Sequence, residues 1–147
     1  MSESPTKDTL AIVTGANGAV GNAYLQEFSR IPTVRSVGIV RKETTEKIPH
    51  VEYIGNVDLL KPSDVEQAIE SIGCRDALKI LLVHPVGKFK FEEAQSQNID
   101  PDILLSNLGT LEHTIGPILK HMNRRASLVV CGFGSVSDKY DVPFWRS

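Results

Sequence analysis

The residues best suited to chemistry lie in one glycine-rich stretch, Thr14–Gly21, which follows a short apolar run and precedes a helical pattern. In this context Gly15 permits a tight turn, Gly18 lets the backbone approach a pyrophosphate, and Gly21 lets the helix pack closely on the strand. The amino end of the helix adds unpaired N–H groups and a positive dipole end. The stretch therefore predicts a phosphate site of a dinucleotide rather than a bare glycine-rich turn.

A second candidate pair indicates which dinucleotide is bound. Arg41 stands 20 positions after Gly21, directly beyond the next strand-like run, and Lys42 follows it. An acidic residue at such a position holds a ribose 2′-hydroxyl, whereas an arginine accommodates a 2′-phosphate. The pair therefore favours NADP(H) over NAD(H). In the alternative, Arg41 and Lys42 are only solvent-exposed charges of a loop and bind no phosphate, as the neighbouring charge of Glu43 suggests.

Two further strand ends carry polar candidates. Val57 and Asp58 follow the third strand-like run, and we expect the Asp58 carboxylate to accept from an adenine amino group while the neighbouring backbone frames the ring. In the alternative, Asp58 orders the turn before the next helix. His84 closes the fourth run, and no metal site is predicted there, because the remaining histidines show no ligand spacing around it.

The elements that must position these residues are read from the apolar pattern. Buried-strand runs fall at 10–13, 34–40, 51–54, 78–83 and 128–131, and helical patterns fall between them. This alternation requires crossover connections. We expect an α/β, three-layer Rossmann fold with a doubly wound parallel sheet of about five strands in the order 3-2-1-4-5.

The last helical pattern is the longest. Asp100 suits its N-cap and Pro101 its first position. Its spacing predicts a kink at Gly116-Pro117 and one apolar face. That face consists of Leu104, Leu108, Leu111, Ile115, Leu119 and Met122.

Composition limits the class of protein. The 147 residues, 41% of them hydrophobic, suit one domain over 1–147 with a polar leader at 1–8. A net charge of −2, from 16 Lys+Arg and 18 Asp+Glu, disfavours a nucleic-acid partner. Two cysteines, no apolar signal segment and no apolar run approaching about 18 residues lead us to expect a cytoplasmic protein without a membrane partner.

Taken together, the glycine turn, the aspartate after the third strand and the segment Asn107–Leu111 resemble the short-chain dehydrogenase/reductase family. The GxxGxxG spacing is similar to that of its extended and atypical branches. The resemblance runs from about Thr9 to Ser137. It implies a Rossmann fold, NAD(P)(H) binding, and hydride transfer to or from carbonyls and alcohols, or epimerisation and dehydration of sugars.

The resemblance also implies roles for single residues. Arg41 and Lys42 would meet the 2′-phosphate, and Val57 and Asp58 the adenine. Asn107 matches a helix asparagine that supports the family's proton relay, or is a packing polar group. The dinucleotide phosphates would be held by Gly15, Asn17, Gly18, Ala19, Val20 and Gly21. The route from the ribose to the nicotinamide would be lined by His84, Pro85 and Val86, in a segment that departs from the family's Asn-Asn-Ala-Gly.

The catalytic residues of the family are not matched. Its chemistry needs a tyrosine, a lysine four positions on that lowers the tyrosine pKa, and a serine that orients the carbonyl. Ser135 and Ser137 are displaced candidates for the serine, and Tyr140 is followed four positions later by Phe144. The sequence therefore predicts only the amino-terminal Rossmann portion of the family, with no YxxxK motif.

Such a truncated domain leaves its fifth strand as a sheet edge and part of its long helix uncovered, so we expect self-association there. Alternatively, Phe133, Phe144 and Trp145 fold back over the edge. Two functions stay open: an NADP(H)-dependent oxidoreductase whose Tyr and Lys are supplied elsewhere, and a non-catalytic dinucleotide-binding or redox-sensing module. A Rossmann domain that binds no nucleotide is the third reading.

Overall fold

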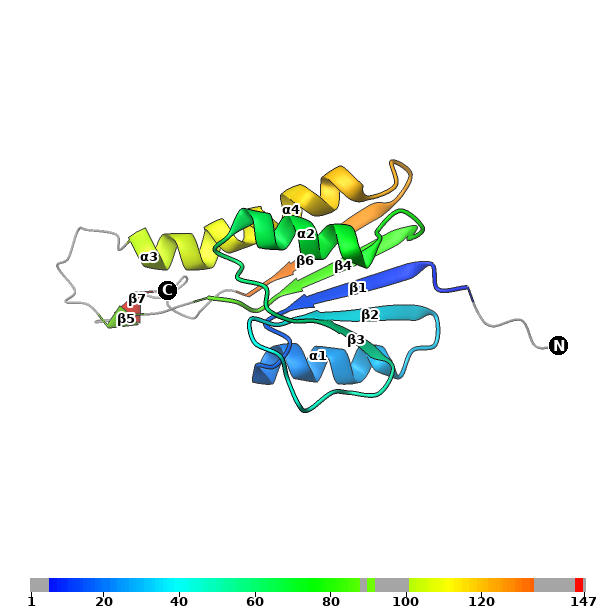
Figure 1. The fold of residues 1–147 in the computed structure, drawn as a ribbon, viewed down its shortest axis with the longest axis horizontal. Helices are drawn as coiled ribbons and strands as arrows, with labels where there is room; N and C mark the ends of the chain where they lie inside the picture. Colours follow the sequence, from blue (N-terminus) through cyan, green and yellow to red (C-terminus); the bar gives the residue numbers. More distant parts are fainter. Residues whose placement is uncertain (1–5, 88–89, 92–100, 134–144, 147) are drawn as a thin grey trace.

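The computed structural model describes residues 6–87, 90–91, 101–133 and 145–146 (Figure 1). In the first half of the chain the elements are β1 (Thr9–Thr14), α1 (Ala19–Ser29), β2 (Val34–Ile39), β3 (Val51–Ile54), α2 (Pro62–Ile72) and β4 (Lys79–His84). They are followed by β5 (Lys90–Phe91), α3 (Pro101–Leu104), a π segment (Leu105–Gly109), α4 (Thr110–His121), β6 (Ser127–Gly132) and β7 (Trp145–Arg146).

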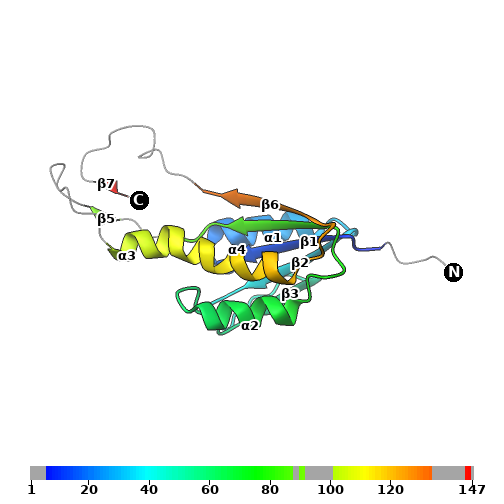
Figure 2. The ribbon, with the colours of Figure 1, turned by 90° about the horizontal axis from the view of Figure 1, so that it is seen from above.

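Five of the strands form one parallel sheet in the order β3-β2-β1-β4-β6. Because β6 is the fifth strand of this sheet along the chain, the predicted order 3-2-1-4-5 is confirmed. Helix α1 covers one face, and α2 and α4 cover the other, so the three-layer Rossmann architecture is confirmed as well (Figures 1 and 2). The antiparallel pair β5 and β7 forms a second, two-stranded sheet that the sequence did not predict.

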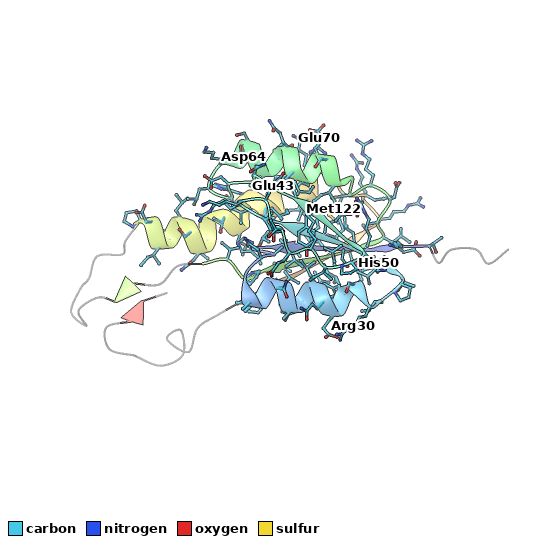
Figure 3. All side chains as sticks on the ribbon, turned by 60° about the horizontal axis from the view of Figure 1, so that its bottom comes forward. Arg30, Glu43, His50, Asp64, Glu70 and Met122 are labelled. Carbon is cyan, nitrogen blue, oxygen red and sulfur yellow. The ribbon has the colours of Figure 1, made fainter. Side chains whose placement is uncertain are left out.

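The core lies on both faces of the central strands, and side chains fill the space between the ribbons of the sheet and the helices (Figure 3). Strands β1 and β4 are continuous apolar runs because helices cover both of their faces. Ile12 and Leu82 point into a cluster with residues of α2 and α4. Val13 and Val83 point into a second cluster against Leu25 of α1. This alternation fixes the register of β1 and β4, so that their carboxyl ends, at Thr14 and His84, lie side by side.

Both ends of α2 are set by residues with special backbone properties. Pro62 is its first residue, and Gly73, with φ of 73°, is the left-handed residue that ends it. Beyond the helix, the guanidinium of Arg35 donates from Nη1 to the Ile72 carbonyl over 2.7 Å and from Nε to Glu52 over 2.6 Å. The end of α2 is thereby tied to β2 and β3.

The prediction for the buried face of the long helix is partly wrong. Leu108 and Leu119 are 60% and 57% exposed, and Leu104 is exposed as well. Leu111, Ile115 and Met122 do pack partly against the core. The side that is fully buried carries Ile103, Ser106, Thr110, Thr114 and Ile118.

Polar residues can occupy that buried face because the helix itself satisfies their hydroxyl groups. Thr110 Oγ1 donates to the Ser106 carbonyl over 2.6 Å, and Thr114 Oγ1 to the Thr110 carbonyl over 2.8 Å. Each bond reaches back four residues, so burial leaves neither threonine hydroxyl unpaired. The helix departs from α geometry at the π segment, whereas α4 continues through Gly116-Pro117, where the sequence predicts a kink, to His121.

Candidate functional site

The predicted site residues meet at the carboxyl ends of the strands of the parallel sheet. From β1 the chain proceeds through β2 and β3 on one side and through β4 and β6 on the other, so the loops after β1 and β4 diverge. Open α/β sheets bind ligands at such a switch point, beyond the carboxyl ends of the strands. Ser135 lies outside the described residues. The other candidates follow the carboxyl ends of β1 to β4 or lie on the π segment: Gly15, Asn17, Gly18, Ala19, Val20, Gly21, Arg41, Lys42, Val57, Asp58, His84, Pro85, Val86 and Asn107.

The glycine turn has a shape that side chains would block. Gly15 has φ of 57°, and a Cβ added there would lie 3.1 Å from Val86 Cγ2. A Cβ on Gly21 would overlap the Gly15 carbonyl oxygen and lie 3.0 Å from its carbon. The tight turn at Gly15 and the close helix–strand packing at Gly21 are thus as predicted. The approach of a pyrophosphate at Gly18 stays a prediction.

The amino end of α1 opens onto this turn. Gly18 is the N-cap and provides no side-chain cap, and the first turn holds no acidic residue. Asn22 donates the first bond of the helix, to the Gly18 carbonyl over 2.9 Å. The earlier amides of a helix have no acceptor within it, and Ala19 and Val20 are exposed here. The exposed helix start therefore presents N–H donors and positive dipole potential to an anion.

The loops after β2 and β3 lie beside each other. Val57 N donates to the Val40 carbonyl over 3.2 Å. A Cβ on Gly55 would meet Glu43 Cγ at 2.9 Å, so the Glu43 stem packs over the second loop. Arg41 and Lys42 are exposed, and within the described part of the chain neither forms an ion pair. Their charges point out where these two loops meet.

Asp58 has a structural duty in its own turn. Its Oδ1 accepts from Leu60 N over 3.0 Å, and its backbone N–H donates to Asp64 Oδ2 over 3.2 Å. These bonds support the alternative in which Asp58 orders the turn before α2. Val57 is buried, and contact with an adenine stays a prediction for both residues.

His84, at the end of β4, is 3% exposed and bonded at both ring nitrogens. Its Nδ1 lies 2.7 Å from Thr14 Oγ1, and its Nε2 lies 3.0 Å from Thr110 Oγ1. Because Thr110 donates its one hydroxyl proton to the Ser106 carbonyl, it must accept from Nε2–H. Nδ1 then carries no proton and accepts from Thr14. The neutral Nε2–H tautomer satisfies every group in this chain of hydrogen bonds.

Thr14 and Thr110 were missed as site residues by the sequence reasoning. Thr14 is a polar residue at the end of an apolar strand, which is a weak signal, and its partner lies 70 residues away.

Burial lowers the pKa of His84 from 6.5 to about 4, so the imidazole is neutral near pH 7.

This lowered pKa predicts that the protein loses stability in acid. An unfolded histidine takes up a proton near pH 6.5, whereas folded His84 does so near pH 4, so the unfolded state binds more protons between these values. The stabilisation is complete above about pH 6.5 and is lost toward pH 4, by at most about 3 kcal/mol for this group. Urea unfolding of the wild type and of His84→Asn over this range measures it. Equal pH slopes in the two proteins would contradict the assignment.

Asn107 lies beside the segment that follows β4. A Cβ on Gly87 would come within 2.6 Å of Asn107 Oδ1, so this side chain packs against the Gly87 backbone. The structure therefore brings Asn107, on the π segment, against the segment that follows β4. Its part in a proton relay stays a prediction.

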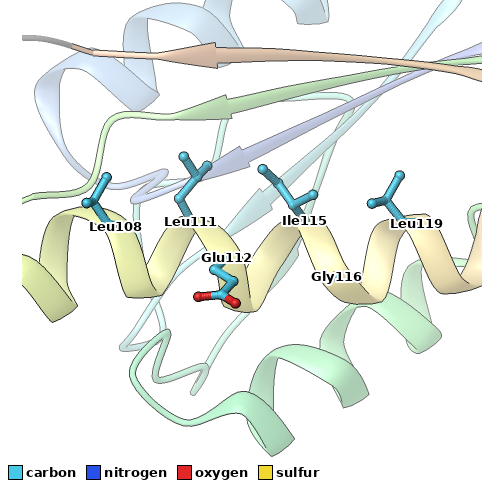
Figure 4. Close-up of a pocket in the computed structure, with 6 residues that line it drawn as sticks. All are labelled: Leu108, Leu111, Glu112, Ile115, Gly116 and Leu119. Carbon is cyan, nitrogen blue, oxygen red and sulfur yellow. The ribbon is translucent and has the colours of Figure 1, made fainter.

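Away from this site, the π segment and α4 carry a shallow apolar groove of about 410 Å³ on the side turned away from α2 (Figure 4). Leu108, Leu111, Ile115 and Leu119 lie in one row along the helix (Figure 4). Val129 and Val130 of the edge strand β6 are also exposed. Self-association through these surfaces stays a prediction. Of the helices in the described ranges, none has the length and apolar character needed to cross a membrane.

No protein-family model and no curated protein matches the sequence, whereas solved structures match the fold. A short-chain dehydrogenase family protein from Francisella tularensis is 19% identical with a TM-score of 0.62, covering 84% of this chain and 50% of its own. Aldohexose dehydrogenase from Thermoplasma acidophilum, in ligand-free form, is 22% identical with a TM-score of 0.66, covering 84% and 49%. A doubly substituted Serratia marcescens short-chain dehydrogenase/reductase is 14% identical with a TM-score of 0.72, covering 95% and 64%.

This chain spans about half the length of the first two of these structures. At such identities the similarity concerns the fold. The chain therefore has the Rossmann fold found in structures of short-chain dehydrogenases/reductases.

Proposed function

We propose that this protein binds a nicotinamide dinucleotide, NADP(H) in preference to NAD(H), with the diphosphate on the amides of the turn Gly15–Gly21. The observation that carries the proposal is the tight turn at the switch point, which seats the amino end of α1 so close to β1 that a Cβ on Gly21 would overlap the Gly15 carbonyl oxygen. Within the turn, Ala16 N donates to the Ile39 carbonyl over 3.2 Å and Gly18 N to the Gly15 carbonyl over 2.9 Å. The donors that support the proposal are therefore the amides of Asn17 and of the first turn of α1, which have no acceptor within the helix. The residues present fit the cofactor.

The preference for NADP(H) rests on Arg41 and Lys42. Both are exposed at the junction of the loops after β2 and β3. In Rossmann sites this position faces the 2′ substituent of the adenosine ribose. A guanidinium forms two parallel bonds to a phosphate, which a ribose hydroxyl cannot replace.

When bound, the cofactor would supply hydride transfer at its nicotinamide. The chain's own residues would bind and orient it: the turn at the phosphates, Arg41 and Lys42 at the 2′-phosphate, and the 85–86 segment beside Gly15. Each tyrosine of the 147 residues is followed four positions on by Phe or Val rather than Lys. We therefore propose that hydride transfer to a substrate requires a Tyr and Lys from another segment or chain. The alternative is a non-catalytic dinucleotide-binding or redox-sensing module.

Calorimetric titration of the protein with NADPH and with NADH tests the proposal. We expect NADPH to bind about tenfold to a hundredfold more tightly, because a charge-assisted bond to the 2′-phosphate contributes about 1.5–3 kcal/mol. Equal affinities would remove the NADP(H) assignment, and no heat with either nucleotide would remove dinucleotide binding. With NADPH and a panel of aldehydes, ketones and quinones we expect no oxidation at enzymatic rates.

A further inference from the structure

One imidazole joins three parts of the chain at the switch point. Thr14 donates to His84 Nδ1 over 2.7 Å, and His84 Nε2 donates to Thr110 Oγ1 over 3.0 Å. The Thr110 hydroxyl donates its own hydrogen bond to the Ser106 carbonyl over 2.6 Å. This chain of hydrogen bonds, which we call the His84 relay of bonds, thus spans β1, β4 and the π segment.

Each residue of the His84 relay of bonds lies next to a segment that lines the candidate site. Thr14 directly precedes Gly15, the left-handed residue of the turn. His84 directly precedes Pro85 and Val86, and the Val86 methyl lies 3.1 Å from the Cβ position of Gly15. Ser106 and Thr110 flank Asn107, which packs against Gly87. A shift of any of these hydrogen-bonded residues would therefore shift a segment that lines the site.

The relay of bonds has one favourable arrangement of protons. Thr14 has a second acceptor, the Val83 carbonyl, but at 3.5 Å it is too long to compete with His84 at 2.7 Å. Thr14, His84, Ser106 and Thr110 are all buried, so water does not replace a lost partner readily. Among the described residues, His84 forms hydrogen bonds only to uncharged groups. The imidazole is therefore held in one orientation.

We propose that His84 is a positioning residue of the dinucleotide site, which holds the glycine turn, the exit of β4 and the π segment in register. The inference rests on the proposed function, because it names what keeps that site in shape. A histidine that only paired buried polar groups within the core would stabilise the fold without any specific effect on the glycine turn. The two roles are separable, because α4 carries another buried threonine outside the relay of bonds.

Thr110→Val and Thr114→Val form the matched pair. Both remove a buried hydroxyl that bonds a carbonyl four residues back, but only Thr110 contacts His84. We expect Thr110→Val to lower NADPH affinity about tenfold, and Thr114→Val to leave it within about twofold. Urea unfolding of both variants verifies that each is folded and measures its loss of stability separately.

Two variants of His84 each keep one half of the contacts. In His84→Asn the side-chain oxygen stands near the Nδ1 position and still accepts from Thr14, but the side chain is too short for Thr110. In His84→Gln the amide nitrogen stands near the Nε2 position and still donates to Thr110, while Thr14 loses its acceptor. We expect both to bind NADPH more weakly than the wild type and more tightly than His84→Ala. Equal affinity of all four proteins would overturn the proposal.

A measurement without nucleotide separates this proposal from the proposed function. In ¹⁵N spectra of the nucleotide-free protein, Thr110→Val should shift the amides of Gly15, Gly18 and Gly21, whereas Thr114→Val should not. Unmoved turn amides would overturn the positioning role, whatever the protein binds. If those amides move but the wild type binds neither NADPH nor NADH, the coupling stands and dinucleotide binding fails. The imidazole ¹⁵N shifts should report the Nε2–H tautomer, and the opposite tautomer would also contradict the relay of bonds.

Discussion

Replacing Gly21 by alanine is expected to abolish measurable dinucleotide binding and to lower the free energy of unfolding by about 1–3 kcal/mol. The new methyl would overlap the Gly15 carbonyl oxygen and lie 3.1 Å from Ala16 Cα, and all of these atoms are backbone. No rotamer change relieves such a contact, so the helix must move away from the strand. That movement carries the first amides of α1 away from the turn. Calorimetry with NADPH and urea unfolding measure the two effects.

Gly116→Ala is the matched control for this substitution. Gly116 also lies inside a helix, but nothing beyond its chain neighbours and the helix backbone lies within 4 Å of its Cβ position. Alanine there should leave NADPH affinity unchanged and alter the free energy of unfolding by less than about 1 kcal/mol, because the gain in helix propensity is opposed by contact of the new methyl with the Pro117 ring. If Gly21→Ala bound NADPH as tightly as Gly116→Ala, the turn would not be the phosphate site.

Replacing Arg41 by alanine is expected to weaken NADPH binding about tenfold to a hundredfold while NADH binding stays within about twofold. The loss is selective because only NADPH carries the 2′-phosphate that a guanidinium in this position would meet. Arg41 is exposed and makes no ion pair with the described residues, so its removal should not disturb the fold. Parallel titrations of wild type and variant with both nucleotides provide the measurement.

Arg75→Ala controls for the loss of one positive charge. Arg75 is exposed between α2 and β4. It lies near the amino end of β4, whereas Arg41 follows the carboxyl end of the parallel strand β2. Its replacement should change neither affinity, which excludes a general effect of net charge. A drop of equal size for NADPH and NADH in Arg41→Ala would show that Arg41 contacts a part common to both nucleotides, and would contradict the proposed preference.

The sequence was sufficient for the features that depend on local pattern. Strand β1 follows from the run Leu10–Val13, because a parallel strand covered on both faces is apolar throughout. Pro62 and Gly73 bound α2 because one lacks the N–H that the first turn leaves unpaired, and the other adopts positive φ without strain. The glycine turn was found because its spacing reflects a requirement for space within eight consecutive residues.

The features that depend on distant partners were not predictable. Thr110 and Thr114 count as polar in a hydrophobic pattern, yet they face the sheet because carbonyls four residues back accept their protons. The predicted stripe through Leu108 and Leu119 is exposed for the same reason. The contacts of His84 join residues that are 70 and 26 positions away. No periodicity contains that information.

The central claim is that the main-chain amides after β1 receive a diphosphate. Titration of the ¹⁵N-labelled protein with NADPH tests it most directly, since each amide reports its own surroundings. We expect saturable shifts that are largest for the amides of Asn17 and of residues 19–21, whose N–H groups have no backbone acceptor here, with smaller shifts at Arg41 and Val86. Shifts absent with both NADPH and NADH, or confined to the Leu108–Leu119 face of α4, would contradict it.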